Sequence, residues 1–124
     1  MNLQDSGKRV EFKTGAQREV VPGKGKYVLI SPIMLKRLAD ALEAGAIKYS
    51  DRNWEKGLPL SSCVDSAYRH LTKMADGLED EDHAALLLCN IMFYIHLKHK
   101  IDIGKLPKEL DDLPRERLLD AKKE

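Results

Sequence analysis

The segment from Ala84 to Leu97 is apolar on almost every side and restricts the fold more than any other part of this chain. Its polar interruptions are Asn90 and, near the end, His96. A helix that is apolar all round lies at the centre of a fold, covered by its own domain or by a partner subunit. At about fourteen residues, the run is too short to span a bilayer. We therefore expect a central helix over residues 82–99 and a homo-oligomer, a dimer or larger, that buries it.

A second helix is expected just before the central one, over residues 62–76. Cys63, Ala67, His70 and Met74 follow one another at spacings of four, three and four, which places them on one helical face. Gly77 is suited to end this helix. Because the connection to the next helix is short, the two helices should run antiparallel.

Three polar residues fall on the apolar faces of this helix pair. His70 precedes Gly77 by about seven residues and His83 follows it by about six, so the two rings should lie at similar depth and approach each other. Asn90 shares a face with His83 and is expected one to two turns deeper. Buried imidazole and amide groups need hydrogen-bond partners. The three residues therefore form one candidate polar cluster, which either lines a binding site or consists of core residues with satisfied hydrogen bonds.

The remaining segments complete a mainly α fold, a small bundle of three main helices in a single domain. Ser31-Pro32 opens a helix over residues 32–48, in which Gly45 predicts a break or a close approach by another group. Ser62-x-x-Asp65 predicts a capping box at the start of the next helix. Residues 1–30 should form an extended or hairpin arm, with short extended runs at 9–13 and 27–30. Residues 31–100 form the helical core, and the proline-interrupted residues 101–124 form a tail that wraps the surface or a partner.

Composition argues against several classes of function. The chain has 124 residues, and its 21 Lys and Arg nearly balance its 20 Asp and Glu. A nucleic-acid coat or a membrane-surface helix needs more basic excess, so we expect neither nucleic acid nor membrane as a partner. Cys63 and Cys89 lack the CxxC spacing and are expected to be reduced core residues. With no signal peptide in front, a cytoplasmic location is expected.

The loop after the first helix gathers side chains that suit a nucleotide. Lysine and arginine bind phosphates, asparagine binds a base edge, and tyrosine or tryptophan stacks on a base. The alternative is that Tyr49 and Trp54 only cover the helical bundle. The candidate substrate-binding residues of this loop are Lys48, Tyr49, Arg52, Asn53 and Trp54.

Carboxylates suggest a metal site, whereas other catalytic patterns are missing from the sequence. There is no GxSxG, no P-loop and no GxGxxG. Glu79 and Asp82 lie three residues apart and would share a face if helical, and Asp40 and Glu43 have the same spacing. Hard divalent cations bind such carboxylates and leave room for substrate phosphates. We therefore expect Mg²⁺, or Mn²⁺ in its place, at Glu79 and Asp82.

Short motifs spread over residues 14–114 occur in the order of a known family. They are Thr14-Gly-Ala16, Tyr27-x-Leu-Ile-x-Pro32, Gly45-Ala-x-Lys-Tyr49, Asp51-Arg-Asn-Trp-Glu-Lys-Gly57, Asp65-Ser-Ala-x-Arg-His-Leu71, Gly77, Glu81-Asp-His-x-Ala85, Asn90 and Leu106-Pro-x-Glu-Leu-Asp-Asp-Leu-Pro114. With them, the chain resembles the phage and prophage family labelled dATP/dGTP diphosphohydrolase. This resemblance implies a magnesium-dependent all-α pyrophosphohydrolase, related to MazG-like enzymes, that cleaves a purine (deoxy)nucleoside triphosphate to monophosphate and pyrophosphate.

One departure from the MazG-like pattern concerns the metal ligands. Those enzymes bind magnesium through an ExxE pair on one helix and an ExxD pair on another, which Asp40/Glu43 and Glu79/Asp82 only approximate. The positions most typical of the resembled family suggest a nucleotide pocket instead. They are Lys48, Asn53, Trp54, Arg69, His70, His83 and Asn90.

Two functions from different classes follow. As an enzyme, the protein would use His70 or His83 to orient or deprotonate water. Lys48, Arg52 or Arg69 would then neutralise the phosphates, and Asn90 would line the pocket. The alternative is a non-catalytic phage protein in the bacterial cytoplasm, which sequesters a nucleotide or a cyclic-nucleotide signal of host defence. A purely structural oligomer, without any ligand, is a third possibility.

Overall fold

The computed structural model describes residues 4–118, which belong to two compact units, one ending at Ser31 and the other beginning at Pro32. The described residues are mainly helical, with one small antiparallel sheet in the first unit. None of the helices in residues 4–118 is long and apolar enough to cross a membrane.

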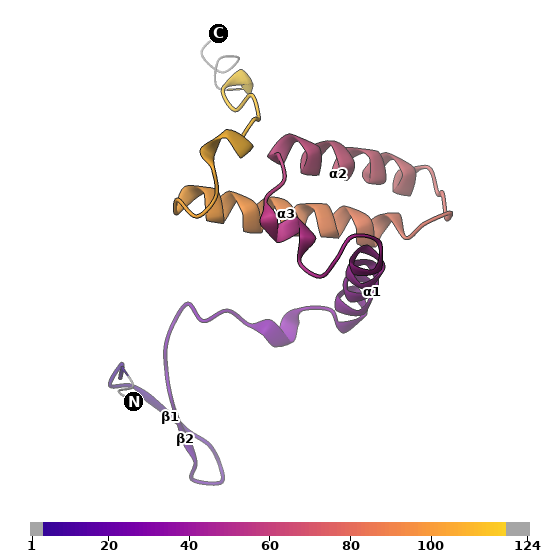
Figure 1. The fold of residues 1–124 in the computed structure, drawn as a ribbon. Coiled ribbons are helices and arrows are strands. Elements are labelled where there is room, and N and C mark those ends of the chain that lie inside the picture. Colours follow the sequence, from indigo (N-terminus) through magenta and orange to yellow (C-terminus); the bar gives the residue numbers. More distant parts are fainter. Residues whose placement is uncertain (1–3, 119–124) are drawn as a thin grey trace. The chain divides into compact units, whose positions relative to one another are not determined.

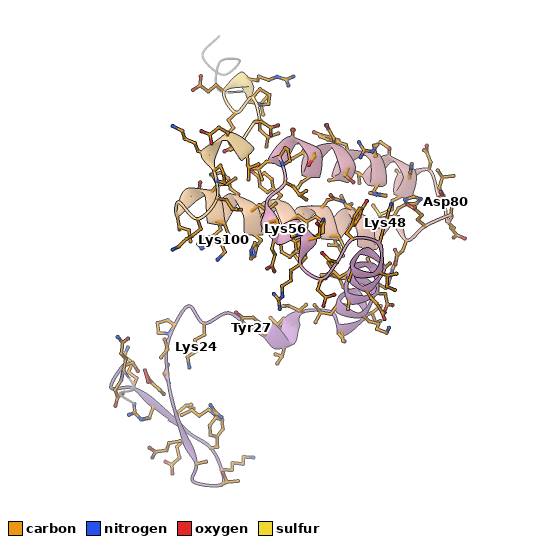
Figure 2. The ribbon with its side chains drawn as sticks, viewed as in Figure 1. Lys24, Tyr27, Lys48, Lys56, Asp80 and Lys100 are labelled. Atoms are coloured by element: carbon orange, nitrogen blue, oxygen red, sulfur yellow. The ribbon has the colours of Figure 1, made fainter. Side chains whose placement is uncertain are left out.

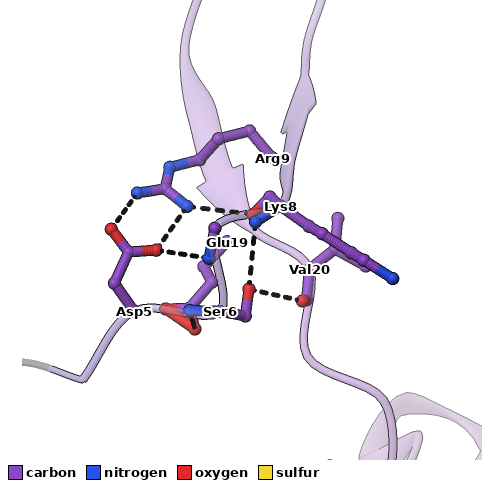
Figure 3. Close-up of polar contacts among 7 residues, drawn as sticks. Asp5, Ser6, Lys8, Arg9, Glu19 and Val20 are labelled. Carbon is purple, nitrogen blue, oxygen red and sulfur yellow. Dashed lines mark hydrogen bonds and ion pairs between the residues drawn. The ribbon is translucent and has the colours of Figure 1, made fainter.

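The first unit is built on a β-hairpin. Strand β1 (Arg9–Glu11) pairs antiparallel with β2 (Gln17–Glu19), so that Val10 lies opposite Arg18. Next to the ladder, the Asp5 carboxylate accepts two hydrogen bonds from the Arg9 guanidinium, and the Ser6 hydroxyl donates to the Val20 carbonyl (Figure 3). These contacts tie the chain on both sides of the hairpin together.

The prediction of a second extended run at residues 27–30 is wrong. Tyr27–Leu29 is instead a 3₁₀ helix, η1, in which Val28 is 92% exposed. The partner of β1 is the nearer segment β2, because closing a short loop costs less entropy than closing a longer one. Gly15 makes that tight turn possible through its φ of 89°.

The second unit is a helical hairpin with a third helix packed against it. Helix α2 (Leu60–Ala75) and helix α3 (His83–Asp102) lie side by side and antiparallel, and α1 (Pro32–Lys48) contacts α3 at a steep angle (Figure 1). The predicted bounds of α1 are confirmed. Helix α2 begins two residues earlier than expected, and α3 continues three residues beyond the expected end at 99. Two 3₁₀ helices, η2 (Asn53–Lys56) and η3 (Lys108–Leu110), complete the unit.

The hydrophobic core lies at the end of the hairpin that is remote from the α2–α3 turn. Leu60 and Cys63 at the start of α2 contact Leu97 and Ile101 near the end of α3. Partly buried side chains from η2, the loop after it, α3 and the tail pack around them: Trp54, Leu58, Phe93, Tyr94, Leu106, Leu110 and Leu113. Nearer the turn, Ala85 and Cys89 of α3 are buried as well, next to the buried His83.

The beginning of α2 is capped differently from the sequence-based expectation. The capping box at Ser62-x-x-Asp65 is wrong, because the helix already begins at Leu60 and the Ser62 hydroxyl donates to the Pro59 carbonyl. The backbone N–H and the hydroxyl of Ser61 both donate to the Asp112 carboxylate, at 2.9 and 2.6 Å. A carboxylate from the tail thus satisfies the first turn of α2.

Gly45 does not interrupt α1. The helix continues through it to Lys48, and a Cβ at Gly45 would meet no atom within 4 Å among the described residues. Leu35 on this helix is 48% exposed. Glycine within a helix costs only about 1 kcal/mol relative to alanine, so the neighbouring residues keep this segment helical.

Candidate functional site

Two histidines meet at the turn end of the α2–α3 hairpin. The Nδ1 atoms of His70 on α2 and His83 at the first position of α3 are 3.0 Å apart, and the ring planes are inclined by 34°. His83 is 3% exposed and His70 is partly buried. The predicted approach of the two rings across the hairpin is confirmed.

The turn that brings the rings together is fixed at both ends. At the end of α2, the N–H of Gly77 donates to the Met74 carbonyl and that of Leu78 to the Lys73 carbonyl, a Schellman motif in which Gly77 has a φ of 75°. This confirms Gly77 as the terminator of the helix. The chain then reaches α3 within a few residues.

At the start of α3, Asp82 is the N-cap and accepts from the Ala85 N–H at 3.2 Å. Its carboxylate also pairs with the Arg37 guanidinium, whose Nε lies 2.8 Å from Oδ2. This bidentate pair joins α1 to the start of α3 and lowers the pKa of the Asp82 carboxyl. Both oxygens of Asp82 thus have partners within the protein.

Asp80 determines which nitrogen of His83 carries a proton. Its carboxylate lies 2.7 Å from His83 Nε2, and this hydrogen bond lowers the pKa of Asp80 (Figure 2 labels Asp80 in the α2–α3 turn). Because a carboxylate only accepts, His83 Nε2 carries the hydrogen. A neutral His83 then presents the lone pair of Nδ1 to His70. Burial lowers the pKa of His70, and the neighbouring His83 adds to this effect, so the uncharged imidazole is favoured.

Glu81 adds a carboxylate to the histidine pair. One donor atom each from His70, Glu81 and His83 lies within 4.8 Å of the other two. Glu81 and His83 also line an open cavity of about 420 Å³ between the turn, the end of α2 and α1. Its remaining lining residues are Arg37, Met74, Gly77, Leu78, Glu79, Asp82 and Ala84. A small polar ligand in this cavity would lie next to the buried ring of His83.

The expectation that Glu79 and Asp82 share a helical face is wrong. Both precede α3, which begins at His83, because Asp82 acts as the cap instead of forming the first turn. Asp82 is also a poor fit to a magnesium cage, since Arg37 and the Ala85 N–H take up its oxygens. Glu79 does line the cavity. The carboxylate grouped with the histidines is Glu81.

Asn90 lies apart from the histidine pair. Its side-chain amide donates to the Leu86 carbonyl of the preceding turn, at 2.9 Å. It lines a second, apolar cavity of about 330 Å³, together with Cys63, Val64, Ala67, Tyr68, Leu71, Leu87, Ile91 and Tyr94. The three-residue polar cluster is therefore reduced to the two histidines.

The loop after α1 packs on another part of α3. Trp54 stacks on Phe93 with ring centroids 4.7 Å apart and meets His96 edge-on at 4.9 Å. Phe93 is ten residues beyond His83, which is about 15 Å along a helix. Trp54 thus covers the helical bundle, which was the alternative to stacking on a base.

The basic residues of the candidate set are exposed. Lys48, at the end of α1 (Figure 2), lies 5.2 Å from the centre of the Tyr49 ring, and Arg52 pairs with Glu55 at 3.2 Å. Arg69 and Tyr49 are exposed as well, while Asn53 is half-buried. Within residues 4–118, no hydrogen bond, ion pair or ring contact joins any of them to the histidine pair.

Sequence reasoning missed Arg37, Asp80 and Glu81. Acidic residues are favoured at a helix N-terminus. Within the run from Glu79 to Asp82, only Asp82 caps the helix, so this effect does not explain the other three residues. A signal for the other two was present, because Asp80 and Glu81 closely precede a histidine on an apolar face. Arg37, 45 residues before Asp82, had no local signal.

The comparisons with known proteins give one match. The family described as dATP/dGTP diphosphohydrolase, N-terminal, matches residues 14–105, well over half of the chain. The match includes both histidines, the acidic run and the loop after α1. No curated protein matches the chain, and no solved structure does. The chain belongs to the family of dATP/dGTP diphosphohydrolase N-terminal domains.

Proposed function

We propose that this chain hydrolyses dATP or dGTP to the nucleoside monophosphate and pyrophosphate. Membership of the family supports nucleotide hydrolysis. We choose this site because His70 closely contacts the buried His83. Glu81 lies beside the pair, and Glu81 and His83 line an open cavity. An open cavity in which a few polar side chains converge is a typical place for a ligand site.

The proposed reaction consumes one water molecule. The water oxygen bonds to the α-phosphorus, the bond from this phosphorus to the oxygen shared with the β-phosphorus breaks, and pyrophosphate leaves with that oxygen. The histidine pair is the proposed place of water activation, because His70 is held uncharged and the Asp80 hydrogen bond orients His83. The proton released from water is taken up there.

Positive charge on the triphosphate side lowers the barrier to phosphoryl transfer. Arg37 lines the cavity, and its guanidinium is paired there with the Asp82 carboxylate. Mg²⁺ or Mn²⁺ remains the proposed counter-ion of the triphosphate, since Mg²⁺ binds through few carboxylates together with substrate phosphates. Glu79 is then the carboxylate on the cavity wall that would face it. Lys48, Arg52 and Arg69 stay proposed phosphate contacts, and Tyr49, Asn53 and Asn90 stay proposed contacts to the nucleoside.

The test is hydrolysis of dATP and dGTP in ¹⁸O-labelled water with Mg²⁺ or Mn²⁺. Attack at the α-phosphorus predicts that the label appears in the monophosphate and that the pyrophosphate is unlabelled. Label in free inorganic phosphate would indicate attack at the γ-phosphorus and contradict the proposal. Recovery of unchanged nucleotide from a bound complex would favour the sequestering protein instead.

His83→Ala and His70→Ala should each lower the rate of pyrophosphate release by about 100-fold or more, the range of a lost acid–base group. His99→Ala is the matched control, because this histidine is exposed near the opposite end of α3. Its rate should equal that of the unmodified chain. Circular dichroism of each variant separates loss of activity from loss of fold, and full activity in a folded His83→Ala would exclude the proposed site.

A further inference from the structure

We propose that His70, Glu81 and His83 form a binding site for a divalent first-row transition-metal ion. The three residues come from α2, from the turn and from the first position of α3, so the hairpin itself assembles the site. Two imidazole nitrogens and one carboxylate oxygen are a donor set typical of Zn²⁺, Mn²⁺ or Fe²⁺ sites. Mg²⁺ and Ca²⁺ prefer oxygen ligands.

The spacing of the two nitrogens matches that of neighbouring ligands on one ion. His70 Nδ1 and His83 Nδ1 are 3.0 Å apart. Two nitrogens bound at about 2.1 Å are separated by about 3.0 Å at a right angle and by about 3.4 Å at the tetrahedral angle. The two nitrogens are therefore already separated as two ligands of one ion would be, and the rings have only to turn so that both lone pairs face it.

The second ring nitrogen of His83, Nε2, makes the hydrogen bond to a carboxylate that is typical of metal-binding histidines. His83 Nε2 lies 2.7 Å from the Asp80 carboxylate and donates to it, so an uncharged ring, the form that binds metals, has its lone pair on Nδ1, the nitrogen beside His70. A carboxylate on the second ring nitrogen fixes the tautomer and the ring orientation of a ligand histidine. Because His83 is 3% exposed and stands at the helix start, its ring has little freedom to turn away.

The third donor faces the cavity. Glu81 is exposed and, with His83, lines the cavity of about 420 Å³. An ion held by three protein ligands on this side keeps further positions directed at solvent or substrate. This is the arrangement of catalytic sites, whereas structural zinc sites are closed by four protein ligands.

Metal binding at this site is independent of the proposed hydrolysis, but a role of the ion in turnover rests on that proposed function. If the ion is bound, its chemistry is to lower the pKa of a coordinated water. In the metal-bound protein, His70 and His83 serve as ligands, and the role of base proposed above belongs to the metal-free pair.

The experiment uses the full chain after treatment with a chelator. Zn²⁺, Co²⁺, Mn²⁺ and Mg²⁺ are titrated separately by calorimetry, and the visible absorption of Co²⁺ reports nitrogen ligation. One Zn²⁺ or Co²⁺ per chain should bind at least about 100-fold more tightly than Mg²⁺, as expected of imidazole donors. Equal affinity for Mg²⁺ and Zn²⁺, or a Co²⁺ spectrum without nitrogen ligands, would overturn the proposal.

Variants assign the ligands. His70→Ala and His83→Ala should abolish the Co²⁺ absorption, and Asp80→Asn should weaken binding by about 10- to 100-fold. Glu81→Gln changes an exposed side chain, so it tests the site even if a histidine variant fails to fold. His99→Ala and Glu109→Gln, at exposed positions remote in sequence, should bind like the unmodified chain.

Unchanged Co²⁺ affinity in both Glu81→Gln and a folded His83→Ala would exclude this site. Tight binding without pyrophosphate release would retain the metal site and count against the proposed function. Turnover without any binding of a transition metal would retain the proposed function and overturn the metal site.

Discussion

His83 is the residue on which most of the local interactions converge. Its ring is buried, one nitrogen contacts His70, the other bonds to Asp80, and its backbone follows the cap at Asp82. A buried imidazole with both nitrogens engaged has a defined tautomer and orientation. A single side chain thus links the end of α2, the turn and the start of α3.

The two cysteines, unlike His83, are buried in surroundings that make their side chains less reactive. Burial raises the pKa of the Cys89 thiol to about 11 and also raises that of Cys63. We predict that neither thiol reacts with a disulfide reagent at pH 8 in the folded protein, because the thiolate is the nucleophile. Both should react within minutes in denaturant. Rapid labelling of the native chain would contradict the burial of these residues.

Leu97 provides the corresponding test of the core. It is 0% exposed and packs with Leu60, Cys63 and Ile101. Leu97→Ala should lower the free energy of unfolding by about 2–5 kcal/mol, through lost burial and the cavity left behind. Urea denaturation measures this change. Val28→Ala, at a position that is 92% exposed, serves as the control and should leave the free energy nearly unchanged.

At the scale of the elements, local patterns located the helices better than their ends. The spacing of apolar residues placed α2, the continuous apolar run placed α3, and Ser31-Pro32 placed the start of α1. Gly77 marked the end of α2 because a left-handed glycine is a local signal. The start of α2 was misplaced because its cap, Asp112, lies 51 residues from Ser61. Part of the site was missed for the same reason: Arg37 meets Asp82 only through the packing of α1 on α3. The histidine contact was predictable, since it follows from the depth of each residue in one hairpin.

The cap from Asp112 gives a pH-dependent prediction. Hydrogen bonds from Ser61 lower the pKa of the Asp112 carboxyl in the folded state. Its stabilising effect is therefore fully present above the unfolded-state pKa of about 3.9 and is lost as the pH falls through the lower folded-state value. Asp112→Ala should lower the melting temperature at pH 7, and its difference from the unmodified chain should shrink in strong acid.

The control for the cap is Glu109→Ala, an exposed carboxylate of the same segment, which should melt like the unmodified chain. A double variant with Ser61→Ala should lose little more than Asp112→Ala alone, because the two changes remove one interaction. A difference between Asp112→Ala and the unmodified chain that stays constant with pH would contradict this role of the carboxylate.

For the whole molecule, the main question is what covers the apolar residues that the second unit leaves exposed. Tyr68 and Leu71 on α2 and Ile91 on α3 line the apolar cavity and are 65%, 43% and 42% exposed, and Ile95 is 63% exposed. The expectation of a central helix buried on all sides is thus met only in part by this chain. The homo-oligomer expected from the sequence remains a prediction.

Light scattering should show a dimer or larger species at micromolar concentration. Ile95→Glu introduces a charge on the exposed face of α3 and should shift the distribution toward the monomer, because burying an unpaired charge is costly. Val28→Glu, in the first unit, is the matched control. A monomer for the unmodified chain would contradict the prediction, as would a mass that Ile95→Glu leaves unchanged.

The central claim is that the histidine pair and Glu81 form the place where a purine deoxynucleoside triphosphate is hydrolysed. The most direct measurement is the rate of pyrophosphate release from dATP and dGTP by the unmodified chain and by Glu81→Gln, with Glu109→Gln as control. We predict turnover by the unmodified chain and by the control, and a rate lower by about 100-fold in Glu81→Gln, as for a lost metal ligand or its support. Equal rates in all three, or no pyrophosphate from well-folded protein with Mg²⁺, Mn²⁺ or Zn²⁺, would contradict the claim.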